Sequence, residues 1–564
     1  MRRQIRRLKR ELEKSNEEEK MKKKLVSLLA VLLCIAMVTG CGGGDDGDGS
    51  QSKIFRWARN YDATTLDTRS INDDGSYEVA ILLVETLVRF KGGEIVPGVA
   101  KDWTVSDDGK EYTFNLREEA TWSDGTPLTA EDFAYSFLNL ITADNACGNA
   151  DRGFIFKNGE EFFKGECKAE DVGVEAVDEH TLKVTFESSG LEKLYELSNY
   201  WFAPVKKDVV EEYGIEYGSE AEKFMGNGAF TVTSWEHGSK IILAKNENYW
   251  DKDSIKVDGM ELTVDVEEKA AADMLSAGEV DAMVAFAYES VKDIEDGNIV
   301  IDPFTSGYQF VHMNSGGCTE ESKRFMENTN FRRALNYAVN RKALVDSIYA
   351  GAAEPATRIT APDALGVEKT FNEEYPFEAW PAEGNPEKAK ECLEAALKEL
   401  GASIDDVPEL TMVCYESQNS TMALQAVQDM ILSTLNIKCS LNPLPIQQML
   451  SKVDNGEWDI WWGGKTLGTL DWASTDSIAD AYDFGSSQCF GYKNEDFSKT
   501  YKEAKGAETL KERKDLLFDM EKIACDDPAS ILAYWSKSFC AHTKNVKGIT
   551  YGNYIDATYV ELTE

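Results

Sequence analysis

The segment from Trp103 to Tyr135 constrains the fold more tightly than any other part of the sequence. Asp107-Asp108-Gly109 is a tight-turn signal, and residues 112–116 alternate as a half-buried strand does. A second turn follows at residues 124–127. Thr129 then occupies an N-cap position, and acids follow it in the first helical turn, where the helix dipole favours them. The segment predicts a strand hairpin followed by a capped helix.

The N-terminal region carries an export signal. A basic run at Lys22–Lys24 precedes an apolar stretch, Leu25–Val38, that is too short to span a bilayer comfortably. The next residues complete Val-Thr-Gly-Cys, the cleavage box of bacterial lipoproteins, which predicts a diacylglyceryl group on Cys41. We expect a signal peptide over 21–40 and a flexible polar tether over 41–52. Lipid alone would then anchor the exported protein to the outer face of the bacterial cell membrane.

Residues 1–20 do not fit this signal. They form a charged, helix-prone run that ends just before Met21, where a signal peptide would begin. We expect translation to start at Met21, which makes residues 1–20 a mis-called upstream extension. A genuine basic cytoplasmic extension is the alternative.

The length and charge of the chain limit which architectures and which partners are possible. A chain of 564 residues exceeds what one compact core usually organises, so at least two lobes are expected. Helical and strand patterns alternate in the C-terminal half, which favours α/β layers. The formal net charge of −40 at pH 7 opposes binding to nucleic acid, which needs basic surfaces, and favours solubility.

The sequence offers no catalytic or metal-binding motif. Its 4 histidines lie in strand-like or turn contexts, and neither Gly-x-Ser-x-Gly nor His-Glu-x-x-His occurs. There is also no P-loop, no Rossmann glycine fingerprint and no Cys-x-x-Cys pair. Cys392, Cys414 and Cys439 lie in apolar, periodic contexts and are expected to pack as small hydrophobic residues. We expect a binding protein without a cofactor and not an enzyme.

Several motifs in a fixed order give the chain a resemblance to a known family. The opening segment reads WTVSDDGKEYTFNLR, then WSDGTPLTAED with YS. Further motifs follow at Gly226–Phe230 with Asn248–Asp251, at Ser276–Asp281, at Asn330–Arg341 and at Asp527–Pro528. Together they resemble the family 5 extracytoplasmic solute-binding proteins, the peptide- and nickel-binding proteins of ABC importers, from about Leu66 to Trp535.

The resemblance implies an α/β fold of the periplasmic-binding-protein type (type II, cluster C), with two lobes and an extra subdomain in the first. It places lobe I over 53–305 with the subdomain at about 84–222, lobe II over 306–533, and a return to lobe I over 534–564. Crossover strands are expected near Phe304 and Tyr534. Periodicity predicts helices at Tyr77–Phe90, Phe331–Tyr349, Pro386–Leu400, Thr421–Leu435 and Lys511–Cys525, and strands at Glu409–Tyr415 and Ile437–Leu441.

The run Trp458–Trp472 is the strongest candidate for a binding site. Alternating tryptophans beside Gly463-Gly464 indicate a strand that ends at an open crevice, where a ligand can approach the backbone closely. Tryptophans in the core of a sheet are the alternative, above all for Trp458 and Trp461. In peptide-binding relatives this strand pairs with the peptide backbone, and an aspartate binds the peptide's free amino group. That position falls near Gly468 here, and Asp471 is the nearest acid.

Weaker candidates lie elsewhere, and for each a scaffold role is an equal alternative. Asn72 belongs to a loop that resembles one lining the cleft in the family, Phe154 lies near an aromatic position of relatives, and Ser306 and Tyr308 flank the first crossover. The full set of predicted ligand-binding residues is Trp461, Trp462, Gly463, Gly464, Lys465, Thr466, Asp471, Asn72, Phe154, Ser306 and Tyr308.

The resemblance implies a receptor that captures oligopeptides by hinge closure and delivers them to an ABC permease. A monomer that does not bind nucleic acid is expected. Two alternatives stay open: the same scaffold binding another solute, such as an oligosaccharide stacked on tryptophan faces, and a receptor that senses peptides for a membrane partner.

Replacing the lipidation residue tests the predicted anchor. Because the cleavage box ends at Cys41, the variant Cys41→Ser removes the only thiol that can carry the lipid, and the protein should move from the membrane fraction to the soluble fraction. Immunoblotting of fractionated cells measures this. Retention of the variant in washed membranes would contradict lipid anchoring at this residue.

Overall fold

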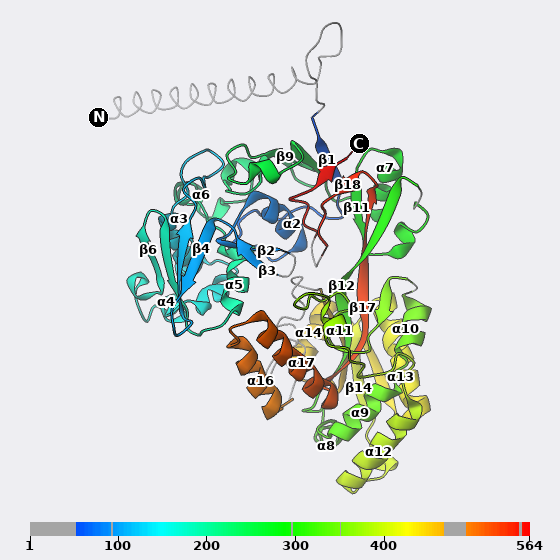
Figure 1. Cartoon of the computed structure of the whole chain (residues 1–564). Helices are drawn as coiled ribbons and strands as arrows, with labels where there is room; N and C mark the ends of the chain where they lie inside the picture. The colour runs from blue at the N-terminus through cyan, green and yellow to red at the C-terminus, as the bar shows by residue number, and fades with distance from the viewer. Residues whose placement is uncertain are drawn as a thin grey trace, which may run out of the picture. The chain divides into compact units, whose positions relative to one another are not determined.

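An 11-stranded mixed sheet organises the protein (Figure 1). The computed structural model describes residues 52–91, 94–294, 297–349, 351–466, 492–551 and 555–563, with the backbone alone for 465 and 466. In spatial order the strands are β15 (Cys439–Leu444), β14 (Leu410–Tyr415), β16 (Ile460–Thr466), β12 (Ile299–Met313), β17 (Ser530–Thr543), β11 (Ala282–Ala285), β1 (Ile54–Ala58), β10 (Gly259–Thr263), β9 (Lys240–Lys245) and β8 (Phe230–Glu236), and β13 (Ala353–Pro355) pairs with β17.

Two long antiparallel strands, β12 and β17, join the halves of this sheet, and Figure 1 shows them side by side. β17 pairs with β11 through residues 539–542, whereas β12 pairs with β16 from Gly307 onward. The register of β12 on β17 shifts between Thr305 and Gly307, so Ser306 is an extra residue at the passage from one half to the other. Such a bulge bends a strand and re-aims its side chains.

The crossovers expected near Phe304 and Tyr534 thus fall on β12 and β17. We call the half with β8–β11 and β1 the first lobe and the half with β14–β16 the second lobe. The boundaries expected at 305/306 and 533/534 lie inside these two strands, and they stay predictions.

The helix α2 (Asp74–Leu83) covers one face of the first lobe, where Val79, Leu82 and Leu83 join its core. The prediction of a helix over Tyr77–Phe90 was wrong at both ends. The helix starts earlier because the Asp73 carboxylate accepts a hydrogen bond from the Ser76 N–H at 2.8 Å. It ends at Leu83, whose carbonyl accepts from the Gly228 N–H at 2.8 Å, and the β-branched residues that follow lead into a strand.

A separate four-stranded sheet forms the subdomain of the first lobe, with the order β4 (Ala100–Val105), β5 (Glu111–Leu116), β7 (Thr181–Thr185) and β6 (Val174–Asp178). The predicted hairpin is confirmed: Trp103 lies opposite Phe114, and Gly109 has φ 69° in the turn. The predicted cap is confirmed too, since Thr129 precedes α3 (Ala130–Leu140) and its N–H donates to Asp132 at 2.8 Å. Buried aromatic rings fill the space between α3 and the sheet.

The remaining elements of the first lobe are short. They are the pair β2 (Val88–Lys91) and β3 (Glu94–Pro97), the pair β18 (Val546–Lys547) and β19 (Glu561–Leu562), and the helices α4 (Gly159–Phe163), α5 (Glu192–Leu197), α6 (Lys207–Tyr213) and α7 (Glu268–Ala277).

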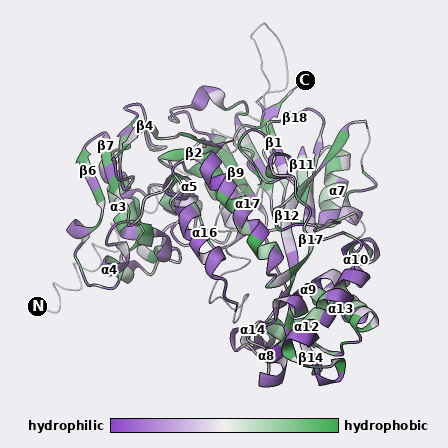
Figure 2. Cartoon of the chain, turned by 60° about the horizontal axis from the view of Figure 1, so that its bottom comes forward, coloured by the Kyte–Doolittle hydropathy of each residue, from purple (hydrophilic) through white to green (hydrophobic). Residues whose placement is uncertain are grey.

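Helices surround the strands of the second lobe. They are α8 (Glu320–Met326), α9 (Thr329–Ala338), α10 (Arg341–Ile348), α11 (Phe371–Glu374), α12 (Pro386–Leu400), α13 (Gln418–Leu435), α14 (Ile446–Asp454), α16 (Glu495–Lys505) and α17 (Leu510–Asp526). Figure 2 shows α16 as largely hydrophilic, and only Phe497 and Ala504 of this helix are buried.

Most helix predictions for the second lobe agree with these bounds, but the single helix expected over Phe331–Tyr349 was wrong. It divides into α9 and α10 because the Asn340 side chain caps a new helix, accepting from the Ala343 N–H at 2.8 Å. Asparagine is a strong N-cap residue and so favours a helix start over a helix interior.

Cysteine burial agrees with the sequence analysis. Cys392, Cys414 and Cys439 are buried, and every cysteine among the described residues is a free thiol. Among these residues we find no helix with the length and apolar character needed to cross a bilayer.

Asp459, at the start of β16, fixes the strand that leads to the lobe boundary. Its carboxylate accepts from the Cys318 N–H and the Thr411 N–H, both at 2.8 Å. Its backbone carbonyl accepts from Asn314 at 2.9 Å. One buried residue therefore joins the end of β12, through its carbonyl, to the start of β14 and to the loop at Cys318, through its carboxylate.

Asp459→Ala should lower the free energy of unfolding by about 2–4 kcal/mol, because it leaves two partly buried backbone N–H groups without an acceptor. Chemical denaturation followed by tryptophan fluorescence measures the change. Asp454→Ala, at an exposed position on the neighbouring helix, is the matched control and should leave stability unchanged. Equal stability of the two variants would show that the Asp459 carboxylate is not needed.

A cavity where the two lobes meet

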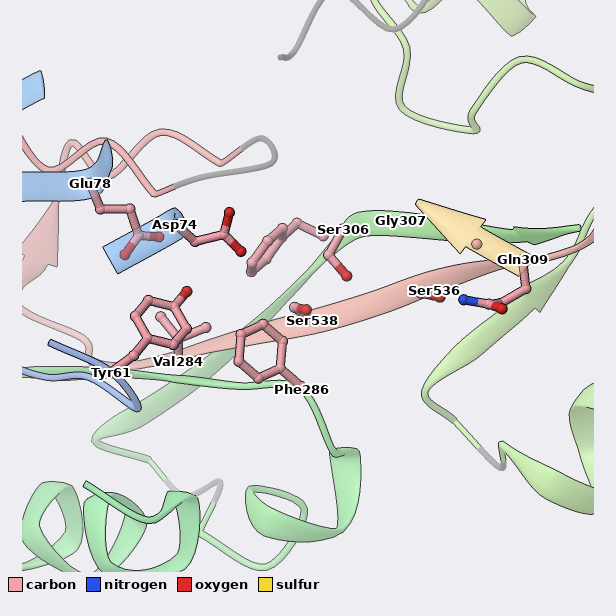
Figure 3. Close-up of a pocket in the computed structure, with 12 residues that line it drawn as sticks. Tyr61, Asp74, Glu78, Val284, Phe286, Ser306, Gly307, Gln309, Ser536 and Ser538 are labelled. Atoms are coloured by element: carbon pink, nitrogen blue, oxygen red, sulfur yellow. The ribbon is translucent and has the colours of Figure 1, made fainter. Parts of the chain in front are cut away.

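A cavity of about 220 Å³ lies where β12 and β17 pass between the lobes (Figure 3). The first lobe contributes residues from α2, β11 and the segments after β1 and β11. The second lobe contributes residues from β16 and the far part of β12. The lining residues are Tyr61, Asp74, Glu78, Val284, Phe286, Phe304, Ser306, Gly307, Gln309, Gly464, Ser536 and Ser538.

Two carboxylates from α2, Asp74 and Glu78, line one side of the cavity. They stand four residues apart, so a helix places them on the same face, one turn from each other. Figure 3 shows both near Tyr61. Carboxylate oxygens on this side of the cavity can accept hydrogen bonds from a ligand.

Glu78 forms a buried ion pair with Arg59. Burial raises the pKa of Glu78, and the Arg59 charge opposes that rise. The Glu78 carboxylate also accepts from the Ile555 N–H at 3.4 Å. The Arg59 guanidinium lies 5.3 Å from the centre of the Trp57 ring and 5.4 Å from that of Tyr61. The pair therefore links α2 to the strand β1 beneath the cavity.

An aromatic pair lines another side of the cavity. Tyr61 stacks on Phe286 with ring centroids 6.3 Å apart and an interplanar angle of 29°. Phe286 keeps 47% of its surface exposed. The Glu268 carboxylate accepts from the Phe286 N–H at 3.0 Å and so fixes the backbone that carries this ring. The structure thus holds an aromatic face open to a ligand.

Hydroxyl groups from the two joining strands complete the lining. The bulge in β12 places Ser306 on the cavity, and β17 contributes Ser536 and Ser538. The Ser538 side chain is 0% exposed, and its hydroxyl oxygen has no hydrogen-bond partner within the described part of the chain. Buried hydroxyls are normally bonded, so this group is a place where a polar ligand atom fits.

The glycines of β16 bring backbone to the cavity wall. Gly464 pairs with Gln309 of β12, and a Cβ at Gly464 would overlap the Gln309 side-chain amide. β14 pairs with β16 at Ile460 and Trp461 alone. Among the described residues, 463–466 therefore pair only with β12, and the opposite edge of this stretch keeps its backbone groups for another partner.

Some of the predicted binding residues line the cavity, and others are buried in hydrophobic cores. Ser306 and Gly464 line the cavity together, and their contact with a ligand stays a prediction. Trp461, Trp462 and Tyr308 instead have 8%, 4% and 1% of their surface exposed and belong to hydrophobic cores. Trp461 stacks on His312 at 4.8 Å, and Trp462 packs beside Tyr534 at 6.1 Å. Any ligand contact at these three positions would come from backbone atoms.

Other predicted residues lie apart from the cavity lining. Asn72 is exposed just before the cap of α2, and Phe154 packs against Phe163 in the subdomain at 5.3 Å. The backbones of Lys465 and Thr466 pair with Tyr308 and Gly307. Asp471 and the lipidation residue Cys41 lie outside the described residues.

Sequence reasoning missed several lining residues. Asp74 belongs to the loop 72–75 that the sequence analysis likened to a cleft-lining loop of the family, whereas Glu78 was missed because it lies inside a helix whose face could not be assigned to a cavity from the sequence. Phe286 and Ser538 offered no signal, because a lone aromatic residue or serine has no distinctive pattern. No group of three or more histidine, cysteine or acidic residues suited to a metal ion occurs in the ranges that the structure describes.

Comparison with protein families identifies the family of this chain. Residues 94–485 match the family described as bacterial extracellular solute-binding proteins, family 5. The chain belongs to this family. Members bind solutes outside the cytoplasm, so a cavity between two lobes is the expected place for a ligand.

Individual relatives of this family 5 protein span nearly the same length. The chain is 26% identical over 521 residues to the dipeptide-binding protein DppE of Bacillus subtilis, covering 90% of this chain and 91% of that one. It is 26% identical over 547 residues to the oligopeptide-binding protein OppA of the same organism, covering 93% and 95%. The substrate-binding domain of an oligopeptide ABC transporter from Bacillus anthracis superimposes with a TM-score of 0.67 at 25% identity, over 91% of this chain and 99% of that one.

The buried pair below the cavity of this solute-binding protein should be essential for its stability. Glu78→Gln leaves the Arg59 charge buried without its partner and should lower the free energy of unfolding by about 3–5 kcal/mol. Chemical denaturation measures the loss. The double variant Arg59→Met with Glu78→Leu should recover much of it, since an apolar pair carries no buried charge.

Glu160→Gln is the control, because it breaks an exposed helical ion pair and should not change stability. A Glu78→Gln protein as stable as this control would show that the buried pair does not hold α2 to β1.

Proposed function

We propose that this protein is the substrate-binding component of an ABC importer and that its ligands are peptides. Membership of the family carries the solute-binding role. The peptide assignment is supported by the relatives, which are named as dipeptide- and oligopeptide-binding proteins, and by the Bacillus anthracis protein, which is the substrate-binding domain of an oligopeptide ABC transporter. Binding and release, and not catalysis, are the chemistry of such a component.

The edge of β16 that has no strand partner among the described residues is the feature that favours a peptide. An extended peptide can add to an exposed strand through backbone hydrogen bonds, which give affinity without reading sequence. Residues 463–466 pair with β12 and have no second strand partner among the described residues, and glycine at 463 and 464 leaves room for the neighbouring side chains of Trp461 and Gln309. We infer that this stretch pairs with the ligand's backbone while the cavity holds one of its side chains or ends.

The strands β12 and β17 are suited to act as the hinge. Both belong to each half of the sheet, and the bulge at Ser306 interrupts their register where the halves meet. Hinges are short stretches that absorb backbone rotation while packed lobes stay rigid. We propose that the lobes close around the peptide by rotation at this point, with the lobe boundaries expected from the sequence.

The oligosaccharide alternative is not favoured. It rested on tryptophan faces for sugar stacking, and Trp461 and Trp462 lie in hydrophobic cores, while Trp472 lies outside the described residues. The aromatic residues that line the cavity are Tyr61, Phe286 and Phe304. We further propose that a lipid on Cys41 anchors the protein to the outer face of the cell membrane, beside the permease. We also propose that the protein acts as a monomer.

Calorimetry with defined ligand pools tests the proposal. Purified protein, freed of bound ligand by unfolding and refolding, should bind a mixed pool of short peptides and ignore a pool of oligosaccharides. Small-angle X-ray scattering on the same samples should show a smaller radius of gyration with peptide, because closure brings the lobes together.

The two measurements separate two failures. Binding of sugar in place of peptide would overturn the peptide assignment and leave the solute-binding role in place. Peptide binding without a change in the radius of gyration would overturn hinge closure alone.

A further inference from the structure

We propose that the part of the cavity formed by β12 and β17 is a subsite for a primary carboxamide, the end group of an asparagine or glutamine side chain in the ligand. Gln309 of β12 and Ser538 of β17 are the residues that we assign to bind it. The inference rests on the proposed peptide-binding function and adds the kind of side chain that the cavity selects. A primary carboxamide carries two N–H donors and one carbonyl acceptor, so it needs partners of both kinds.

The Ser538 hydroxyl marks the cavity as a place for a polar ligand atom. It is wholly buried, lines the cavity and has no hydrogen-bond partner within the described part of the chain. A buried polar group left unbonded costs folding free energy, and most such groups are bonded in native proteins. A hydroxyl can accept a hydrogen bond and donate one, so it suits either end of a carboxamide.

The Gln309 amide supplies both donors and an acceptor to the same cavity. Gln309 lies opposite Gly464 of β16, and a Cβ at Gly464 would overlap the Gln309 amide nitrogen. Glycine at 464 therefore leaves the amide its place against the strand. Figure 3 shows the amide group pointing into the cavity. A second amide that meets it there can donate to its oxygen and accept from its nitrogen.

The pairing of the two strands places further hydroxyls beside these groups. Ser536 and Ser538 stand two residues apart on β17, so their side chains lie on the same face of the strand. Ser536 lies opposite Gly307, and Ser306 is the extra residue of the bulge next to it. All three serines line the cavity. The two joining strands therefore give the cavity hydroxyl and amide groups, and no charged side chain among its described residues.

The charges around the cavity disfavour an ionic ligand group. None of the described lining residues is lysine or arginine, so a ligand carboxylate would be buried there without a cationic partner from this set. Of the two acids, Glu78 is paired with Arg59 and Asp74 has an interaction of its own, so neither is a free partner for a cation. A neutral group with donors and acceptors avoids both penalties.

An apolar side chain fits the cavity less well than a carboxamide. It would cover the Ser538 hydroxyl and the Gln309 amide without bonding to them, and sites built to hydrogen-bond a ligand group reject analogues that lack it. The stacked rings of Tyr61 and Phe286 line the same cavity and offer apolar surface to the methylene groups that carry the carboxamide.

A panel of synthetic tetrapeptides tests the subsite by calorimetry. The parent is Ala-Ala-Ala-Ala, and each position in turn carries glutamine, asparagine, methionine, leucine, glutamate or lysine. Methionine matches glutamine in length and leucine matches asparagine in shape, but neither has an amide. We expect one position at which glutamine or asparagine binds the wild-type protein at least tenfold more tightly than its apolar match, about 1.4 kcal/mol, and more tightly than glutamate or lysine.

Gln309→Met should reduce this preference to within twofold and leave the affinity for the alanine peptide within twofold of the wild-type value, because it removes the amide and keeps the chain length. Ser538→Ala should reduce the preference at least threefold. It should not lower the melting temperature of the ligand-free protein, because the hydroxyl that it removes has no partner among the described residues. Gln425→Met, at an exposed position of α13, is the control and should behave as wild type.

The outcomes separate this inference from the function on which it rests. Peptides that bind equally well with glutamine and methionine, and with asparagine and leucine, at every position overturn the carboxamide subsite and leave peptide binding intact. Tighter binding of glutamate or lysine at the selective position has the same meaning, as does a Gln309→Met protein that weakens all peptides alike. Absence of binding to every tetrapeptide overturns both.

Discussion

The antiparallel pairing of β12 with β17 is the interaction on which the rest of the structure depends. These strands run through both halves of the 11-stranded sheet and carry residues of both lobes. The pairing keeps backbone groups hydrogen-bonded on both sides of the bulge at Ser306, so the chain passes between the lobes within a sheet. It also places Ser538 of β17 on the same cavity as Ser306 and Gln309 of β12, although the two strands are distant in the sequence.

The site is built by combining a rigid and an adaptable side. The first lobe supplies α2 with its capped start and the buried pair of Arg59 and Glu78, together with an aromatic pair held by Glu268. The second lobe supplies backbone groups of β16. Such groups can bond to the backbone of an extended ligand whatever side chains it carries. A receptor built in this way can hold one charged or polar feature of a ligand firmly and accept variation along the remainder. This combination fits uptake of many related peptides.

Much of the fold was predictable from local patterns, and much of the site was not. The hairpin at Trp103–Phe114 and the helix at Pro386–Leu400 were found because turn residues, caps and periodicity are encoded within a few positions. The limits of α2 were missed because its end is set by Gly228, a tertiary partner far along the chain. The tryptophans of β16 were predicted as ligand contacts because of their large faces. Their burial could not be predicted, because it depends on neighbours such as His312 and Tyr534. Ser538 could not be assigned to the cavity from the sequence, because only the pairing of β17 with β12 places it there.

The buried pair of Arg59 and Glu78 also limits how the cavity can be altered. Glu78 lines the cavity and at the same time pairs with Arg59, so one side chain serves both the ligand space and the folded core. A substitution that removes the Glu78 charge leaves Arg59 buried without its partner and destabilises the fold. Redesign of the cavity for another ligand is therefore better begun at the lining residues that carry no such pair, such as the half-exposed Phe286.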